Sequence, residues 1–290
     1  MPSHDFQRDP GESPLPDQVK SFVISLNGTP RNAKLPTQLF NQGIIPQVVR
    51  AVDGRLGDGI FDSQFVDIEL FRNVTGRIPS GPEVGCALSH LSCARLAHAS
   101  GAALALIFEE DANVVASLGP AVRLMLEMDP NTPIVLTLYS EVEPVLEKET
   151  IREISPEGAG VLGRLFLPPP NTVAYIMNRE AINLFASKNV VEGVADWPPW
   201  AYAVDFWAYY PWPVSHSESG SVIDKSRSLA RGKLKNRSRY VAAALAYMTL
   251  FGPRKVQAHS QSLGGLRAYL NRVIVPSTRH YIARFRWRKA

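Results

Sequence analysis

Three consecutive acids follow an apolar run in the stretch LIFEEDANV, residues 106–114. In an extended backbone alternate side chains share a face, so Glu109 and Asp111 should point to one side and Glu110 to the other. Two carboxylates aimed at one point suit a hard divalent cation such as Mg²⁺ or Mn²⁺, which also takes phosphate oxygens of a substrate as ligands. An acidic cluster after a strand is by itself more common as a solvated turn or a helix cap, so the elements around it must decide.

The chain before this motif opens as a strand, a helix and a second strand. An apolar, β-branched run predicts a strand over 19–26, and a helix is predicted over 30–42 with a kink or early break at Pro36. A second strand is predicted over 46–54. Strands joined through a helix run parallel, which predicts an α/β domain with a mostly parallel central sheet flanked by helices. In such sheets ligands bind at the carboxyl ends of the strands, where residues 109–111 fall.

The clearest helix is predicted over residues 80–101. Ser80 and Glu83 have the spacing of a capping box at its start, and Gly101 can end it. The alternation of strand and helix continues to about residue 190. Its further predicted parts are strands over 102–108 and 132–140, and a strand leading into a helix over 171–187.

The composition predicts a globular protein. A chain of 290 residues with 45% hydrophobic content can bury one large domain or two small ones. Residues 1–18 are polar and proline-rich without the basic start and apolar core of a secretory signal, so we expect a disordered leader and a cytoplasmic protein. Cys86 and Cys93 are seven positions apart in the predicted helix, roughly 10 Å, which is too far for a disulfide. Both are expected to be small core residues.

The charge is divided unevenly along the chain. Residues 225–290 contain 16 Lys and Arg and no Asp or Glu, so residues 1–224 keep 15 basic against 27 acidic residues. We expect a globular domain over 19–224 followed by a basic helical tail with amphipathic helices at 239–251 and 263–275. Such a tail favours a polyanionic partner, either an anionic membrane surface or nucleic acid.

An aromatic segment spans residues 197–212 and holds four of the five tryptophans and three tyrosines. Its prolines argue against an ordinary helix. Two interpretations remain open: the rings pack against a sugar or line a ligand cleft, or they form an apolar structural cap.

Five ordered pieces of the chain resemble glycosyltransferase family 25, which includes lipopolysaccharide biosynthesis transferases. They are VISLNGTPRN at the first strand, AVDG at 51–54, GPEVGCALSH at 81–90, LIFEEDANV at 106–114 and NTVAYIMNREAI at 171–182. The resemblance implies a GT-A-like fold, a nucleotide-sugar donor, typically UDP-galactose, and inverting transfer to a glycan or lipid-linked glycan. The usual acidic motif of the family is Glu-Asp-Asp, whereas Glu110 occupies its middle position here.

The resemblance also implies roles for individual residues. A divalent cation, Mn²⁺ or Mg²⁺, would be held by Glu109, Asp111 and His216, the last being a late residue that returns to the metal. Residues expected to line the donor site are Ser25, Leu26, Arg31, Asp53, Ser89 and His90. Among these, Arg31 would meet phosphate at a helix N-terminus, and Asp53 either contacts the nucleotide or only closes its turn.

Two acids are assigned to catalysis. Inverting transfer requires a base that takes the proton of the acceptor hydroxyl and charge stabilisation on the departing diphosphate. Asp205, within the aromatic segment, is the predicted base, with Trp207 as part of an acceptor platform. Glu110 is the second, on the expectation that it contacts the donor sugar or ribose.

Two other classes of function compete with this interpretation. Paired carboxylates also serve glycoside hydrolases, although acids two residues apart on one strand are poorly placed to flank a glycosidic bond. A non-enzymatic membrane or nucleic-acid module would make the basic tail the main feature. The tail lacks the aromatic interleaving of an RNA platform, so we expect no nucleic acid and a peripheral position on the cytoplasmic face of the inner membrane.

Overall fold

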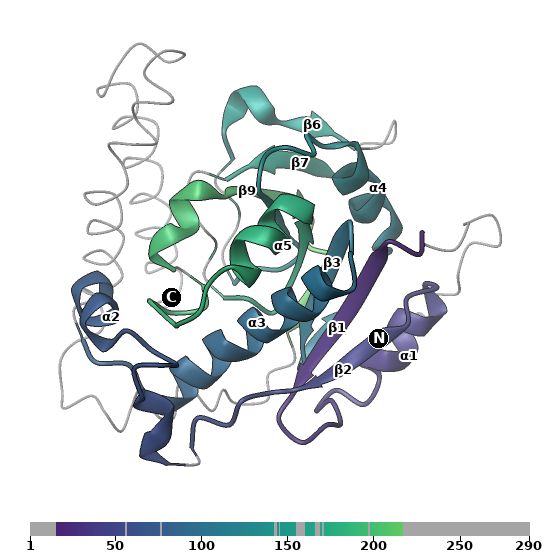
Figure 1. Cartoon of the computed structure of the whole chain (residues 1–290). Helices are drawn as coiled ribbons and strands as arrows, with labels where there is room; N and C mark the ends of the chain where they lie inside the picture. The colour runs from purple at the N-terminus through teal and green to yellow at the C-terminus, as the bar shows by residue number, and fades with distance from the viewer. Residues whose placement is uncertain are drawn as a thin grey trace, which may run out of the picture. The chain divides into compact units, whose positions relative to one another are not determined.

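The computed structural model describes residues 16–216, apart from 56, 76, 142–143, 145, 155–159, 166–168, 170 and 197 (Figure 1). The chain divides into two compact units, Met1–Leu234 and Lys235–Ala290, and all that follows concerns the first. The predicted basic tail and most of the predicted leader lie outside the described residues. The described part of that leader, residues 16–18, leads directly into β1, and the Val19 N–H donates to the Pro16 carbonyl at 2.8 Å.

The centre of the unit is an eight-stranded sheet. In spatial order its strands are β2 (Pro46–Arg50), β1 (Val19–Ser25), β3 (Leu104–Glu109), β8 (Ala174–Asn178), β5 (Ile134–Thr137), β9 (Asp205–Tyr210), β7 (Val161–Arg164) and β6 (Arg152–Glu153). Six strands run in one direction, while β8 and β7 run in the other. The predicted α/β class with a mainly parallel sheet is therefore confirmed, and the two reversed strands were not foreseen.

Helices cover both faces of this sheet. On one face α1 (Leu35–Asn41) and α4 (Gly119–Glu127) pack with the inward side chains of β1, β3 and β8 into one hydrophobic core. On the other face α3 (Gly81–Ala99) and α5 (Arg179–Ala186) pack together and against the sheet, and Figure 1 looks onto that face. The remaining elements are α2 (Ile68–Thr75), the 3₁₀ turns η1 (Asp58–Phe61), η2 (Lys148–Thr150) and η3 (Pro199–Ala203), and a two-stranded antiparallel sheet of β4 (Ala112–Val114) and β10 (Val214–His216).

The helix predicted over 80–101 forms as expected. The Glu83 carboxylate accepts the Ser80 backbone N–H at 2.9 Å, as in a capping box, and also pairs with Arg77. Gly101 takes a positive φ of 69° just after the helix end, a conformation that only glycine adopts without steric cost.

Two local predictions are wrong. The helix after β1 begins at Leu35, five residues later than predicted, and Pro36 lies in its first turn, where a missing N–H costs nothing. The extended backbone predicted through Asp111 ends at Glu109, and Glu110 and Asp111 form a turn before β4.

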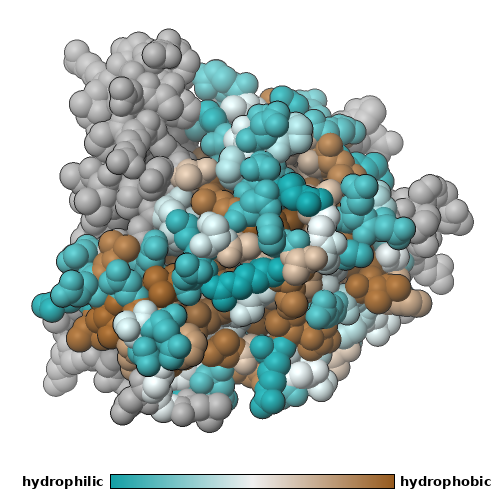
Figure 2. All heavy atoms as spheres, in the orientation of Figure 1, coloured by the Kyte–Doolittle hydropathy of each residue, from teal (hydrophilic) through white to brown (hydrophobic). Residues whose placement is uncertain are grey.

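The outer surface is mixed in character. In Figure 2 hydrophobic residues gather in the lower half of the view, around α2 and α3, among hydrophilic ones. Phe65, Ile78 and Leu96 are exposed large apolar side chains from this part of the chain. Within the part of the chain that the structure describes, no helix has both the length and the apolar character that a membrane crossing requires.

Candidate functional site

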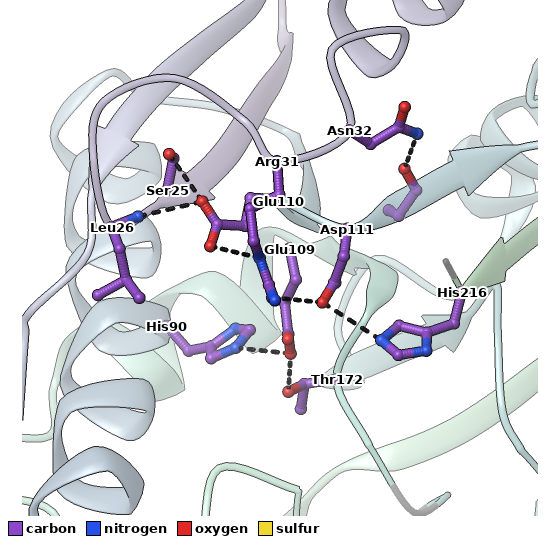
Figure 3. Close-up of polar contacts among 11 residues, drawn as sticks. Ser25, Leu26, Arg31, Asn32, His90, Glu109, Glu110, Asp111, Thr172 and His216 are labelled. Carbon is purple, nitrogen blue, oxygen red and sulfur yellow. Dashed lines mark hydrogen bonds and ion pairs between the residues drawn. The ribbon is translucent and has the colours of Figure 1, made fainter. Parts of the chain in front are cut away.

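The acids of residues 109–111 emerge where β3 leaves the core. Leu104 to Phe108 are fully buried, and the Glu109 N–H donates to the Val173 carbonyl at 2.8 Å. The turn that follows is fixed by Asn32, whose backbone N–H donates to the Glu110 carbonyl at 2.9 Å and whose side-chain amide donates to the Ala112 carbonyl at 2.7 Å. The three carboxylates are thus held by backbone hydrogen bonds at the carboxyl edge of the sheet (Figure 3).

Glu110 has both carboxylate oxygens occupied by the protein. Oε2 lies 2.9 Å from the Ser25 hydroxyl and 3.3 Å from the Leu26 N–H, and Oε1 pairs with Nε of Arg31 at 2.8 Å. Its side chain is buried. Through these contacts Glu110 joins the end of β1, at Ser25 and Leu26, to the turn after β3. The roles predicted for these three residues in donor binding and catalysis stay predictions.

Asp111 is the acid with spare capacity. Its Oδ2 pairs with Nη2 of Arg31 at 2.5 Å and lies 3.2 Å from Nε2 of His216, while Oδ1 is buried and without a hydrogen-bond partner. Burial and the negative charge of Glu109 raise the pKa of Asp111, and they outweigh the attraction of Arg31 and His216. The protein alone therefore disfavours the charged form of this carboxylate and leaves one of its oxygens without a partner.

Glu109 points to the face of the sheet that α3 covers. Its Oε1 accepts the Thr172 hydroxyl at 2.7 Å and lies 3.5 Å from Nε2 of His90, a distance of electrostatic contact and not of a hydrogen bond. Burial opposes its charge, but the interactions with His90, Thr172 and His216 outweigh that cost and lower the pKa of Glu109. His90 is itself oriented by the Tyr175 hydroxyl, 2.8 Å from Nδ1.

The late residue His216 reaches the acids through the small second sheet. β10 pairs with β4 so that His216 lies opposite Ala112, the residue after Asp111. Its ring also stacks on Tyr139, which follows β5, with centroids 6.1 Å apart. The charges of Glu109, Asp111 and His216, the three predicted metal ligands, therefore act on one another. Among the described residues, however, the group whose ligand atoms all lie within 4.8 Å of one another consists of Cys86, His90 and Glu109, and the predicted set stays a prediction.

Arg31 lies elsewhere than predicted. It precedes α1 by four residues, and its guanidinium bridges Glu110 and Asp111 instead of projecting from a helix N-terminus. The side chain is about one-third exposed, at 35%. Arg31 therefore supplies the positive charge that allows two buried carboxylates to lie side by side.

A family model described as glycosyltransferase family 25 (LPS biosynthesis protein) matches residues 18–205, well over half of the chain. The chain belongs to glycosyltransferase family 25. It is also 39% identical over 94 residues to a rat protein named probable inactive glycosyltransferase 25 family member 3. That match covers 31% of this chain and only 16% of the relative, so the chain spans a small part of the relative's length.

The family match contains all the predicted site residues except His216, which lies beyond its end. Within it, the predicted donor-site residue Ser89 makes two hydrogen bonds to the backbone. Its hydroxyl donates to the Gly85 carbonyl at 2.7 Å and accepts the Val52 N–H at 2.9 Å, which ties residues 51–54 to α3. Asp53 closes its turn by binding the Arg55 side chain and backbone N–H, and this arginine lowers the pKa of Asp53.

The glycines of the family pieces AVDG and GPEVG permit the close contact between residues 51–54 and α3. A Cβ on Gly54 would lie 1.8 Å from the Gly81 carbonyl oxygen, and a Cβ on Gly85 would lie 2.4 Å from that of Val52. Any side chain at either position would force the loop away from the helix. Sequence reasoning treated these pieces as donor-site motifs and missed their role in close backbone packing.

Asp205, the predicted base, lies at the opposite edge of the sheet. Asp205 is the partner of Ile134 at the start of β5, and Ile134 in turn lies beside Asn178 of β8. Asn178 is the partner of Leu104, which precedes Glu109 by five residues along β3. Asp205 and Glu109 are thus separated by five residues along the strand direction and by three strands across the sheet, which corresponds to roughly 20 Å. Asp205 instead pairs with Arg164 at 3.2 Å, and the structure does not bring it to the acids.

The aromatic segment contributes mainly to packing. Trp200 is buried edge-on against Phe185 of α5, with centroids 4.5 Å apart, and Phe206 is buried in the sheet. Trp207, the predicted acceptor platform, packs against the hydrophobic core from the middle of β9. These three residues make packing contacts of the kind that the structural interpretation expects, and the acceptor role of Trp207 stays a prediction.

Sequence reasoning missed the contributions of Thr172 and Tyr175 to the site. Both belong to the family piece at 171–182, which was recognised as a strand and helix without a role for either side chain. β8 runs antiparallel to β3, so its start lies beside the end of β3, with Ala174 opposite Phe108. Only that pairing places Thr172 on Glu109 and Tyr175 on His90.

Proposed function

We propose that this family 25 protein transfers a sugar from a nucleotide-sugar donor to a glycan or lipid-linked glycan acceptor, with the donor diphosphate bound at residues 109–111. One observation carries the proposal. Three successive acids lie at the carboxyl edge of a mainly parallel sheet, the position where α/β proteins bind ligands, and one of them has a buried oxygen without a partner. A solvated turn, the competing interpretation, does not leave Asp111 in this state.

The residues present offer ligand atoms for a divalent cation. Glu109 and Asp111 offer the hard oxygen ligands that Mg²⁺ and Mn²⁺ prefer, His216 adds a nitrogen, and Oδ1 of Asp111 is the unfilled donor atom. A bound cation would supply positive charge for the departing diphosphate. Arg31 already neutralises part of the acidic charge. A bound cation would therefore lie beside the guanidinium and would not replace it.

The chain's own residues would do most of the positioning. Glu110 fixes the turn through Ser25 and Leu26, so that Asp111 is held without freedom to swing away. Arg31 offers a cationic group close to the bound phosphates. Asp205 has no part in this proposal, because it lies at the other edge of the sheet.

The finer identity of the reaction follows the family resemblance. We propose a UDP-sugar donor, with galactose as the first sugar to test, a GT-A-like domain and inversion at the anomeric carbon. We also propose that the basic tail, residues 225–290, holds the protein at an anionic membrane surface where lipid-linked acceptors are made. Flotation with vesicles containing anionic lipid should depend on this tail and weaken in high salt, and flotation that persists without it would refute the second proposal.

The direct test is a panel of nucleotide sugars with and without Mn²⁺, scored by thermal shift and by release of free nucleotide. We expect one donor class to raise Tm by several degrees only in the presence of the metal, as for a ligand well above its Kd. Asp111→Asn should abolish this shift, while Asp205→Asn should keep it. A wild-type Tm that no nucleotide sugar changes would overturn the proposal.

A second candidate function comes from the name of the rat relative, which describes a probable inactive member of the family. A chain of that kind would bind a donor without transferring its sugar. Binding with no release of nucleotide, in the presence of lipid-linked and soluble glycan acceptors, would favour this alternative. Nucleotide release that depends on an acceptor would exclude it.

A further inference from the structure

A second group of ligating side chains lies behind the acids, on the face covered by α3. Cys86 and His90 are four residues apart on this helix, so their side chains lie on one side of it, facing Glu109 at the end of β3. The Cys86 sulfur, a His90 ring nitrogen and a Glu109 oxygen all lie within 4.8 Å of one another. Asp111 and His216 are not part of this set.

His90 shows that the group is not fully satisfied by the protein. The residue is only 4% exposed, and its Nε2 atom is buried without a hydrogen-bond partner, 3.5 Å from the nearest Glu109 oxygen. Its other nitrogen, Nδ1, is held by the Tyr175 hydroxyl at 2.8 Å. A metal-binding histidine is commonly oriented in this way, with the second nitrogen fixed by a neighbour and the first turned to the ion.

The chemistry of the three donors selects the kind of ion. A sulfur, an imidazole nitrogen and one carboxylate oxygen match the preferences of Zn²⁺ and of Co²⁺, its spectroscopic substitute, whereas Mg²⁺ and Mn²⁺ prefer oxygen donors. Three protein ligands leave one position of a tetrahedral site open. Binding would displace the thiol proton of Cys86 to solvent, because the thiolate is the ligand.

We propose that Cys86, His90 and Glu109 form a Zn²⁺ site, distinct from the proposed donor-phosphate site but sharing Glu109 with it. An ion bound there would withdraw Glu109 from the donor site. Zn²⁺ would then antagonise the Mn²⁺- or Mg²⁺-dependent binding of a nucleotide sugar. This last consequence rests on the proposed function, whereas the binding of Zn²⁺ does not.

The test is a titration of the full-length reduced chain with Co²⁺, without any nucleotide. We expect one Co²⁺ per chain and the near-ultraviolet absorption band that arises from charge transfer between a thiolate and Co²⁺, with Zn²⁺ displacing the ion and removing the band. Cys86→Ser should abolish the band, and His90→Gln should weaken Co²⁺ binding by at least about tenfold.

The chain provides a matched control in its other cysteine. Cys93 lies on the same helix, is fully buried, and burial raises the pKa of its thiol to about 12. Cys93→Ala should therefore keep the band. A wild-type chain without the band, or a band that survives Cys86→Ser, would overturn the proposal whatever the variants do to folding. Because no donor is present, either result is separate from failure of the proposed transferase activity.

Discussion

Two arginines in this protein each bridge two carboxylates, at opposite edges of the same sheet. At the carboxyl end of β3, Arg31 pairs with Glu110 and Asp111. At the other edge, Arg164 of β7 pairs with Glu147 at 2.6 Å and with Asp205 of β9 at 3.2 Å. The two groups have the same composition, but their surroundings differ.

The two groups differ in the negative charge that the arginine leaves unneutralised. Beside Arg31 stand a third acid, Glu109, and an Asp111 oxygen that is buried without a partner. The group around Arg164 joins Glu147, the residue before η2, to β7 and β9, and Glu147 and Asp205 both pair with the one guanidinium. The third acid and the unfilled carboxylate oxygen beside Arg31 are therefore what distinguish a proposed ligand site from two acids bridged by an arginine alone.

The largest expected effect separates the two aspartates in catalysis. If the ligand site is at Arg31, Asp111→Asn should reduce sugar transfer at least about 100-fold, a loss typical of removing a group that stabilises developing charge. Asp205→Asn should leave transfer within about threefold of wild type. Rates measured with saturating donor and Mn²⁺ check both. Equal losses in the two variants would contradict the comparison and return Asp205 to the list of catalytic candidates.

The second expected effect separates the two arginines in stability. Arg31→Ala leaves Glu110 and Asp111 buried together without a countercharge, which should cost about 2 kcal/mol and lower Tm by about 5 °C. Arg164→Ala should also lower Tm. Millimolar Mn²⁺ should restore part of the loss in Arg31→Ala alone, because only there does a third acid, Glu109, lie close to the two that lose their countercharge. Equal responses of the two variants to Mn²⁺ in thermal unfolding would refute this distinction.

The smallest expected effect concerns pH. Because the pKa of folded Asp111 lies above its ordinary value, the folded chain loses stability as pH rises from that value through the raised one. Asp111→Asn removes this loss, so in EDTA its Tm should exceed that of wild type by about 2 °C at neutral pH, with no excess near pH 4.

Glu109→Gln provides the control of opposite sign for this pH series. The pKa of Glu109 is lowered, so its charge stabilises the fold above the ordinary value, and that stability is lost as pH falls through the lowered one. Glu109→Gln should therefore have a lower Tm than wild type at neutral pH. A decrease of Tm in both variants at neutral pH would show that the charge of Asp111 does not destabilise the folded chain.

Much of the fold could be predicted because its signals are local. The capping box of Ser80 and Glu83, the glycine at 101 and the apolar run before Glu109 each specify an element through residues close in the chain. Pro36 was read as a break because a proline removes one N–H, but it is harmless in a first turn, and the true start of α1 depends on contacts beyond the segment.

The sequence by itself determined that three acids follow a buried strand and that His216 returns late in the chain, because residue type and order need no partner to be read. Tertiary structure alone decided what each acid faces. Strand pairing places Thr172 beside Glu109 and Asp205 at the far edge of the sheet. The turn at 110–111 lets Arg31 pair with both Glu110 and Asp111, whose side chains an extended strand would have pointed to opposite faces. These outcomes depend on which strands become neighbours and in which direction they run, and no short stretch of residues contains that information.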